Sequence, residues 1–139
     1  MRKSFVYVVL AIIAVATMSC KKGDYPTNIQ GTWLYNDTVA NVQSVLSTSS
    51  SSASKGIPAT VTFVDQTQEL SSKVLIDYDP EDGEGSFKPE KGEEGFHGSI
   101  DAIDKLNIKV TLTHVNNKGE STTLLEKAIY TYKQDSNNN

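Results

Sequence analysis

Cys20 is the residue whose chemistry is easiest to interpret from its position in the sequence. It is the only cysteine among 139 residues, so its thiol cannot form an internal disulfide. The segment before it starts with two basic residues, continues as an unbroken apolar run over residues 5–16, and ends in the short stretch 17–20. Secretory signals have this order, and the apolar run is too short to cross a hydrocarbon core of roughly 30 Å. We therefore predict that residues 1–19 are a signal for export.

The pair Ser19–Cys20 resembles the cleavage box of bacterial lipoproteins. Thr17 and Met18 stand where Leu and Ala are common, a variation found in lipoproteins of the Bacteroides type. The resemblance implies that the Cys20 thiol is diacylated and becomes the new, acylated amino terminus, which would hold the protein on a membrane. In the alternative, the cysteine is incidental and a conventional peptidase cuts nearby. Exported proteins seldom keep an unpaired cysteine without a use, which favours lipidation.

A polar, turn-rich stretch over residues 20–28 predicts a short tether between this anchor and a domain. Lys21 and Lys22 follow the cysteine directly, where acidic residues direct some lipoproteins to the cell surface. The lysines favour an outer-membrane lipoprotein of the bacterial cell envelope that faces the periplasm, and surface exposure stays open.

Net charge limits the possible partners. Loss of residues 1–19 lowers the basic count from 13 to 11 and leaves all 17 acids, for a charge of about −6 and no arginine. Nucleic-acid binding needs clustered Lys and Arg, so we expect no nucleic-acid partner, and the charge also argues against an anionic-lipid surface. The remaining length fits one domain, which we place at 29–135, before a frayed tail at 136–139.

Groups that could bind a metal or catalyse a reaction do not have the required spacing. The acidic run 77–85 could supply oxygen ligands for calcium, but its glycine comes one place late for an EF-hand loop and Lys88 occupies the position of the bidentate glutamate. His97 and His114 are the only histidines, and no close ligand spacing joins them. Neither a nucleophile elbow nor a phosphate-binding glycine loop is present. We predict a non-enzymatic protein without metal or cofactor.

The motif Gly31-x-Trp33 predicts the first strand of a β domain. In an extended strand Ile29, Gly31, Trp33 and Tyr35 share one face. This start resembles that of lipocalins and other calycin barrels, and the resemblance implies that Trp33 plugs the closed end of a barrel. The arginine that packs across this tryptophan in transport lipocalins is missing, as is their Thr-Asp-Tyr signature. The chain is therefore most similar to the short lipocalin-like domains of Bacteroides-type envelope lipoproteins.

Alternating apolar and polar residues predict short antiparallel strands after residue 59, joined mostly by hairpins. Leu106, Ile108, Val110 and Leu112 form the clearest inward-facing row. Such a meander favours an all-β fold, an up-and-down antiparallel β-barrel, with a β-sandwich as the alternative. Valines at spacings of three and four predict one short helix over residues 39–46, and the serine-rich stretch 47–56 predicts a mobile loop.

The first two of three hypotheses for the function differ in where a small ligand or a protein partner binds. In the first, the barrel holds a small apolar ligand, and strand phase selects the lining residues Trp33, Phe63, Ile76, Tyr78, Phe96 and Ile108. The same residues would equally make a solid, ligand-free core. In the second, the chain is a protein-interaction or inhibitor module of an envelope complex that uses the acidic loops 80–84 and 90–94. A metal-dependent hydrolase is a third hypothesis.

Overall fold

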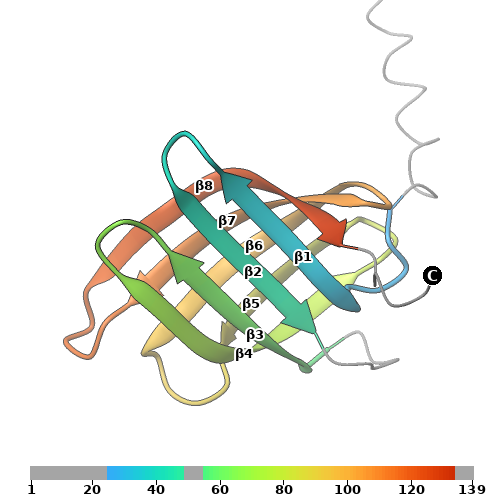
Figure 1. Cartoon of the computed structure of the whole chain (residues 1–139). Helices are drawn as coiled ribbons and strands as arrows, with labels where there is room; N and C mark the ends of the chain where they lie inside the picture. The colour runs from blue at the N-terminus through green and yellow to red at the C-terminus, as the bar shows by residue number, and fades with distance from the viewer. Residues whose placement is uncertain (1–24, 49–54, 134–139) are drawn as a thin grey trace, which may run out of the picture.

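Alternating apolar and polar side chains build this chain into eight antiparallel strands (Figure 1). The computed structural model describes residues 25–48 and 55–133, and the described part of the chain offers no helix that could span a membrane. In chain order the strands are β1 (Gly31–Asp37), β2 (Val42–Thr48), β3 (Ile57–Val64), β4 (Glu69–Asp79), β5 (Glu84–Pro89), β6 (Gly95–Asp104), β7 (Asn107–Val115) and β8 (Ser121–Lys133).

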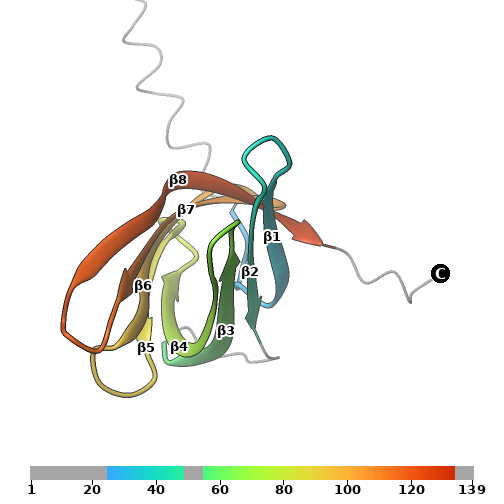
Figure 2. The same cartoon turned by 60° about the vertical axis from the view of Figure 1, so that its left-hand side comes forward.

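The sheet closes into a barrel because β1 pairs with β8 as well as with β2. Three residue pairs hold this seam, with Trp33 opposite Tyr132 at its centre. Closure therefore pairs the first and last strands with each other over these residues, which shortens the open strand edges. Figure 2 shows β8 crossing over to meet β1. The predicted all-β, up-and-down barrel is confirmed, and the β-sandwich alternative is wrong.

The helix predicted over residues 39–46 is wrong, because Val42–Thr48 form strand β2. The Asp37 carboxylate accepts hydrogen bonds from two backbone N–H groups of the following turn, both at 3.1 Å, as a helix N-cap would. The chain then reverses at Asn41, which has a φ of 62°. Pairing of the following residues with β1 overrides the helical spacing of the valines, whose branched side chains also suit a strand.

Two further sequence predictions are wrong at one end of the predicted segment. Ser47 and Thr48 belong to β2 and not to the predicted loop, of which residues 49–54 lie outside the described residues. Leu106 does not face inward with the rest of its row; it lies in the β6–β7 turn and is 49% exposed. The register shift near the end of β6 ends the alternation before this residue.

Buried side chains from all eight strands meet in one cluster inside the barrel. A close backbone approach shapes it at Gly98, where a Cβ atom would lie 2.2 Å from the Phe87 ring. The buried hydrophobic residues are Ile29, Trp33, Leu46, Ile57, Ala59, Val61, Phe63, Val74, Ile76, Tyr78, Phe87, Phe96, Ile100, Ile108, Val110, Leu112, Ala128 and Tyr130.

The two ends of the barrel differ. We call the end at which β1 begins the base; it carries the β4–β5 and β6–β7 turns. The far end carries the turns that follow β1, β3, β5 and β7.

Residues 25–30, here called the base segment, lie against the base. The Tyr78 hydroxyl donates a hydrogen bond to the Pro26 carbonyl oxygen at 2.8 Å, and Ile29 is fully buried. A Cβ atom at Gly83 would lie 2.7 Å from the Tyr25 ring, so this ring packs on the β4–β5 turn. Part of the stretch predicted to be a tether therefore packs on the domain.

Candidate functional site

The six residues predicted to line a ligand site all face the barrel interior. They come from β1, β3, β4, β6 and β7 and belong to one buried cluster. None is more than 3% exposed. Strand phase therefore predicted their orientation correctly, and in this structure they pack against one another and against other core residues. Those six are Trp33, Phe63, Ile76, Tyr78, Phe96 and Ile108.

A groove at the base of the barrel has a volume of about 800 Å³. We call it the base groove. The base segment, the start of β1, the β6–β7 turn and the end of β8 enclose it. Its lining residues are Pro26, Thr27, Asn28, Gln30, Gly31, Thr32, Trp33, Lys105, Leu106, Tyr132 and Lys133.

Two aromatic rings form the inner wall of the base groove. Trp33 and Tyr132 meet edge to face, with ring centroids 5.3 Å apart and an interplanar angle of 64°. The Tyr132 ring also lies over Gly31, where a Cβ atom would be 2.6 Å away. Gly31 has a φ of 105°, which favours glycine, so both the backbone and the contact with Tyr132 require this residue. Tyr132 thus packs across both Trp33 and Gly31.

The buried tryptophan has an unsatisfied donor. Trp33 is 1% exposed, and its indole Nε1–H has no hydrogen-bond acceptor among the described residues. A buried donor without a partner typically costs about 1–3 kcal/mol relative to a satisfied one. A side chain that lines the groove therefore carries a polar group that an acceptor or a water molecule would stabilise.

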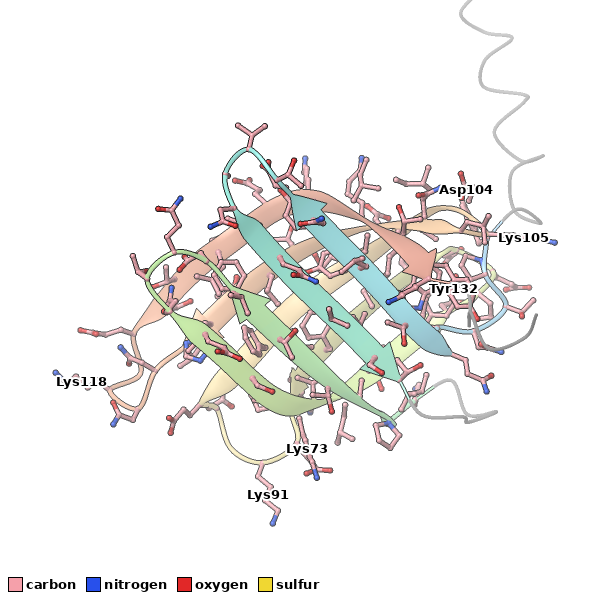
Figure 3. All side chains as sticks on the ribbon, in the orientation of Figure 1. Lys73, Lys91, Asp104, Lys105, Lys118 and Tyr132 are labelled. Carbon is pink, nitrogen blue, oxygen red and sulfur yellow. The ribbon has the colours of Figure 1, made fainter. Side chains whose placement is uncertain are left out.

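The β6–β7 turn positions a lysine and a leucine on the rim of the base groove. The Asp104 carboxylate accepts hydrogen bonds from the backbone N–H of Leu106 at 2.9 Å and from the Asn107 amide. These bonds hold the pKa of Asp104 below its ordinary value, so the carboxylate stays charged and keeps the turn in shape. The backbone N–H of Tyr132 donates to the Leu106 carbonyl at 2.8 Å, which ties the turn to β8. Figure 3 shows Asp104, Lys105 and Tyr132 at this end of the molecule.

The base groove can therefore contact two kinds of chemical group. Leu106 and Tyr132 offer apolar surface, and Leu106 is 49% exposed. Lys105 and Lys133 offer two positive charges from separate elements of the rim, the β6–β7 turn and the end of β8. Sequence reasoning did not select these four residues. The alternation along β8 places Tyr132 in the same phase as Tyr130, but only the closing register shows that it faces Trp33.

A second hollow at the base is acidic. It has a volume of about 530 Å³ and is lined by Asp77, Asp79, Asp82 and Glu84 together with Lys55. Asp77 already accepts a hydrogen bond from the Gly56 backbone N–H at 2.8 Å. Among the described residues, no three His, Cys, Asp or Glu side chains come close enough to hold a metal ion.

Tyr78 stands between the core and this acidic hollow. Burial, and secondly the negative charge of Asp79, raise the pKa of Tyr78 to about 12. The hydroxyl therefore stays protonated at neutral pH and serves as the donor to the Pro26 carbonyl.

The two histidines lie on opposite faces of neighbouring strands. His114 faces inward and packs edge-on against Phe96, with ring centroids 5.1 Å apart. His97 faces outward, where its Nε2 lies 2.8 Å from the Glu93 carbonyl oxygen. The structure therefore does not bring the two imidazoles together.

The two acidic loops of the interaction hypothesis are also separated. Residues 80–84 lie at the base and residues 90–94 at the far end, with β5 between them. Six residues of strand span about 20 Å, so the loops do not form one continuous acidic surface.

Cys20 and the predicted signal 1–19 lie outside the described residues. A scan against protein-family models found no match, and searches of the curated proteins and of the solved structures found none either.

Proposed function

We propose that this chain is a lipid-anchored lipoprotein of the bacterial cell envelope whose lipocalin-like barrel binds a small molecule without catalysing a reaction. Lipidated Cys20 would attach it to the outer membrane, with the barrel facing the periplasm. Trp33 supports the likeness to lipocalins, because it lies on the first strand and is buried beside the base of a closed eight-stranded barrel.

The base groove is the observation that supports binding best. Its volume of about 800 Å³ lies within the range of small-molecule sites, and apolar and polar side chains meet in it. The interior is a poorer site, because a ligand there would have to displace buried side chains such as Phe63 and Phe96. We therefore place the ligand at the base groove and not among the six interior residues predicted from strand phase.

Native mass spectrometry of the protein purified from its own host tests this function. A co-purifying small molecule is expected, and Leu106→Glu should reduce its occupancy by placing a charge on the apolar rim. Ile103→Glu is the matched control, because Ile103 is similarly exposed at 42% but does not line the groove. Failure to detect any co-purifying molecule in repeated preparations would contradict the proposal.

A second candidate function is a protein-interaction module, and an uncharged outer surface favours it. Ten outward positions of β1, β2 and β3 carry no charged side chain, although 22% of the chain is charged. Leu34 and Val45 pair across the middle of this face. Figure 1 views the barrel from the side of these strands. The ten residues are Thr32, Leu34, Asn36, Gln43, Val45, Ser47, Pro58, Thr60, Thr62 and Val64.

Crosslinking in whole cells tests the second function. If a partner covers this face, Leu34→Lys should abolish its capture, because an ammonium would be buried without a counter-charge. Ile103→Lys, on β6, should leave capture unchanged. Equal capture by both variants would contradict a partner on this face.

A further inference from the structure

The positive charges on the rim of the base groove indicate which class of ligand it binds. This inference rests on the proposed function. We propose that the base groove binds a single-chain anionic amphiphile, with the anionic head between Lys105 and Lys133 and the start of the alkyl chain against Leu106 and Tyr132.

Charge is the first argument. The chain carries a formal net charge of −4, yet among the described residues the two charged side chains that line the base groove are both lysines. They come from separate elements, the β6–β7 turn and the end of β8, and the pairing of β7 with β8 brings both to one groove. No ion pair to either lysine is found among the described residues, so their ammonium groups are available to an anion. A hydrogen bond to a charged group contributes more than one between neutral groups.

The inner wall supplies the second argument. The unsatisfied Nε1–H of Trp33 belongs to a side chain that lines the groove. Tyr132 packs edge-on against this indole and is itself only partly buried. An amphiphile that contacts Tyr132 would therefore change the surroundings of the only tryptophan in the chain.

Location is the third argument. The base segment enters at this end, and its first residue, Tyr25, is five positions after Cys20 in the sequence. Five extended residues span at most about 18 Å, so the proposed anchor would hold the groove close to a membrane, where amphiphiles concentrate. Charged amphiphiles such as fatty-acid anions therefore match the groove in both chemistry and position.

Tryptophan fluorescence provides a direct test. Full-length lipidated protein would be held in an amphipathic polymer that contains no tryptophan and titrated with dodecanoate, with dodecanol and with inorganic phosphate. We expect saturable changes in Trp33 emission with dodecanoate at an affinity at least about tenfold higher than with dodecanol, because a charge-assisted hydrogen bond contributes more than 1.4 kcal/mol. Phosphate alone should bind more weakly than dodecanoate, because it lacks the apolar chain.

Paired lysine substitutions locate the head of the ligand. Lys105→Gln combined with Lys133→Gln should weaken dodecanoate binding about tenfold or more and leave dodecanol binding unchanged. The matched control removes two charges far from the groove: Lys91→Gln with Lys118→Gln, both in turns of the far end (Figure 3). Circular dichroism and thermal unfolding would verify that both double variants keep the fold.

Three results would overturn the inference. They are equal affinity for dodecanoate and dodecanol, equal loss of binding in the two double variants, and a fluorescence response to vesicles that contain phosphatidylglycerol but not to dodecanoate. The last result would indicate a bilayer surface in place of a single amphiphile. A neutral molecule that co-purifies with the protein would leave the proposed function standing while this inference fails.

Discussion

At the scale of single residues, a buried chain of hydroxyl groups crosses the barrel. The Tyr130 hydroxyl donates to Ser44 Oγ at 2.6 Å, and Ser44 donates to the Thr62 carbonyl oxygen at 2.6 Å. Burial raises the pKa of Tyr130 above its ordinary value, so its hydroxyl remains a donor. The chain links β8, β2 and β3 through atoms that water does not reach.

Ser44→Ala should destabilise the protein more than Tyr130→Phe. The alanine leaves the buried Tyr130 hydroxyl without an acceptor, at about 1–3 kcal/mol, whereas phenylalanine leaves Ser44 still bonded to the Thr62 carbonyl, at about 1 kcal/mol. The double variant should lose less stability than the two single variants together, because it has no Tyr130 hydroxyl left without an acceptor. Urea unfolding measures the loss of stability in all three variants. Ser47→Ala, on the exposed face of β2, is the control and should change the stability very little. If the losses of unfolding free energy in the two single variants simply add up in the double variant, the proposed chain of hydroxyl groups is contradicted.

Tyr78 should make the fold sensitive to alkali. Its pKa is raised to about 12 in the folded chain, against 10.0 when it is unperturbed, so the folded state holds this proton more tightly than the unfolded state. The stabilisation is fully present below pH 10 and is lost as pH rises from 10 towards 12. The unfolding free energy of Tyr78→Phe should therefore fall less over this interval. Parallel slopes for the two proteins would show that another group causes the loss.

Sequence reasoning at this scale succeeded where alternation alone decides a side chain's direction. Trp33 and Ile108 face inward because each has alternating neighbours on its own strand. Tyr132 was not predicted as a partner of Trp33, since their contact depends on a register between the first and last strands. Lys105 and Lys133 were missed because they line one groove only through the pairing of β7 with β8 and of β8 with β1.

At the scale of elements, β5 and β6 pack closely because Gly98 on β6 has no side chain and leaves room for Phe87 of β5. A Cβ atom at Gly98 would lie 2.2 Å from the Phe87 ring and 2.6 Å from the Thr111 carbonyl oxygen, so both neighbouring strands approach the backbone here. The sequence showed Gly98 only as an inward position in an alternating strand. Strand phase cannot reveal that a ring from the next strand fills the space.

Gly98→Ala should destabilise the barrel by about 3 kcal/mol, because it forces Phe87 out of its place in a packed core. Gly92→Ala is the control: no atom lies within 4 Å of its Cβ position, so only its φ of 69° opposes the substitution, at about 1 kcal/mol. Thermal unfolding compares them, and Phe87→Leu should partly rescue Gly98→Ala. Equal losses for the two glycines would contradict the proposed steric clash.

β2 explains why element type was predicted wrongly in one place. Asp37 supplies hydrogen bonds of the kind that begin a helix, and Val39, Val42 and Leu46 have helical spacing. Val39 is 95% exposed in the turn, so the apparent apolar face does not exist in the fold. The alternation of buried Ser44 and Leu46 was hidden because one of the two inward residues is polar.

At the scale of the whole molecule, the seam between β1 and β8 closes the barrel with the fewest residue pairs. Three pairs join these strands, against nine between β6 and β7. The architecture could be predicted because a meander of alternating strands removes its edges by closing. The sequence could not locate the base groove, because three separate stretches of the chain meet there only after closure.

Tyr132→Ala should open this seam selectively. Loss of the ring removes the contacts with Gly31 and Trp33, and we expect destabilisation of about 2–4 kcal/mol, since the ring is only partly buried. Because the seam has few pairs, hydrogen exchange in peptides from β1 and β8 should accelerate more than in peptides from β3 and β4. Ile129→Ala, on the outer face of β8 and 50% exposed, should change neither region much. Equal acceleration of hydrogen exchange in all strands would mean that the barrel opens as one cooperative unit. The base groove would then have no local motion by which a ligand could reach the Trp33 indole.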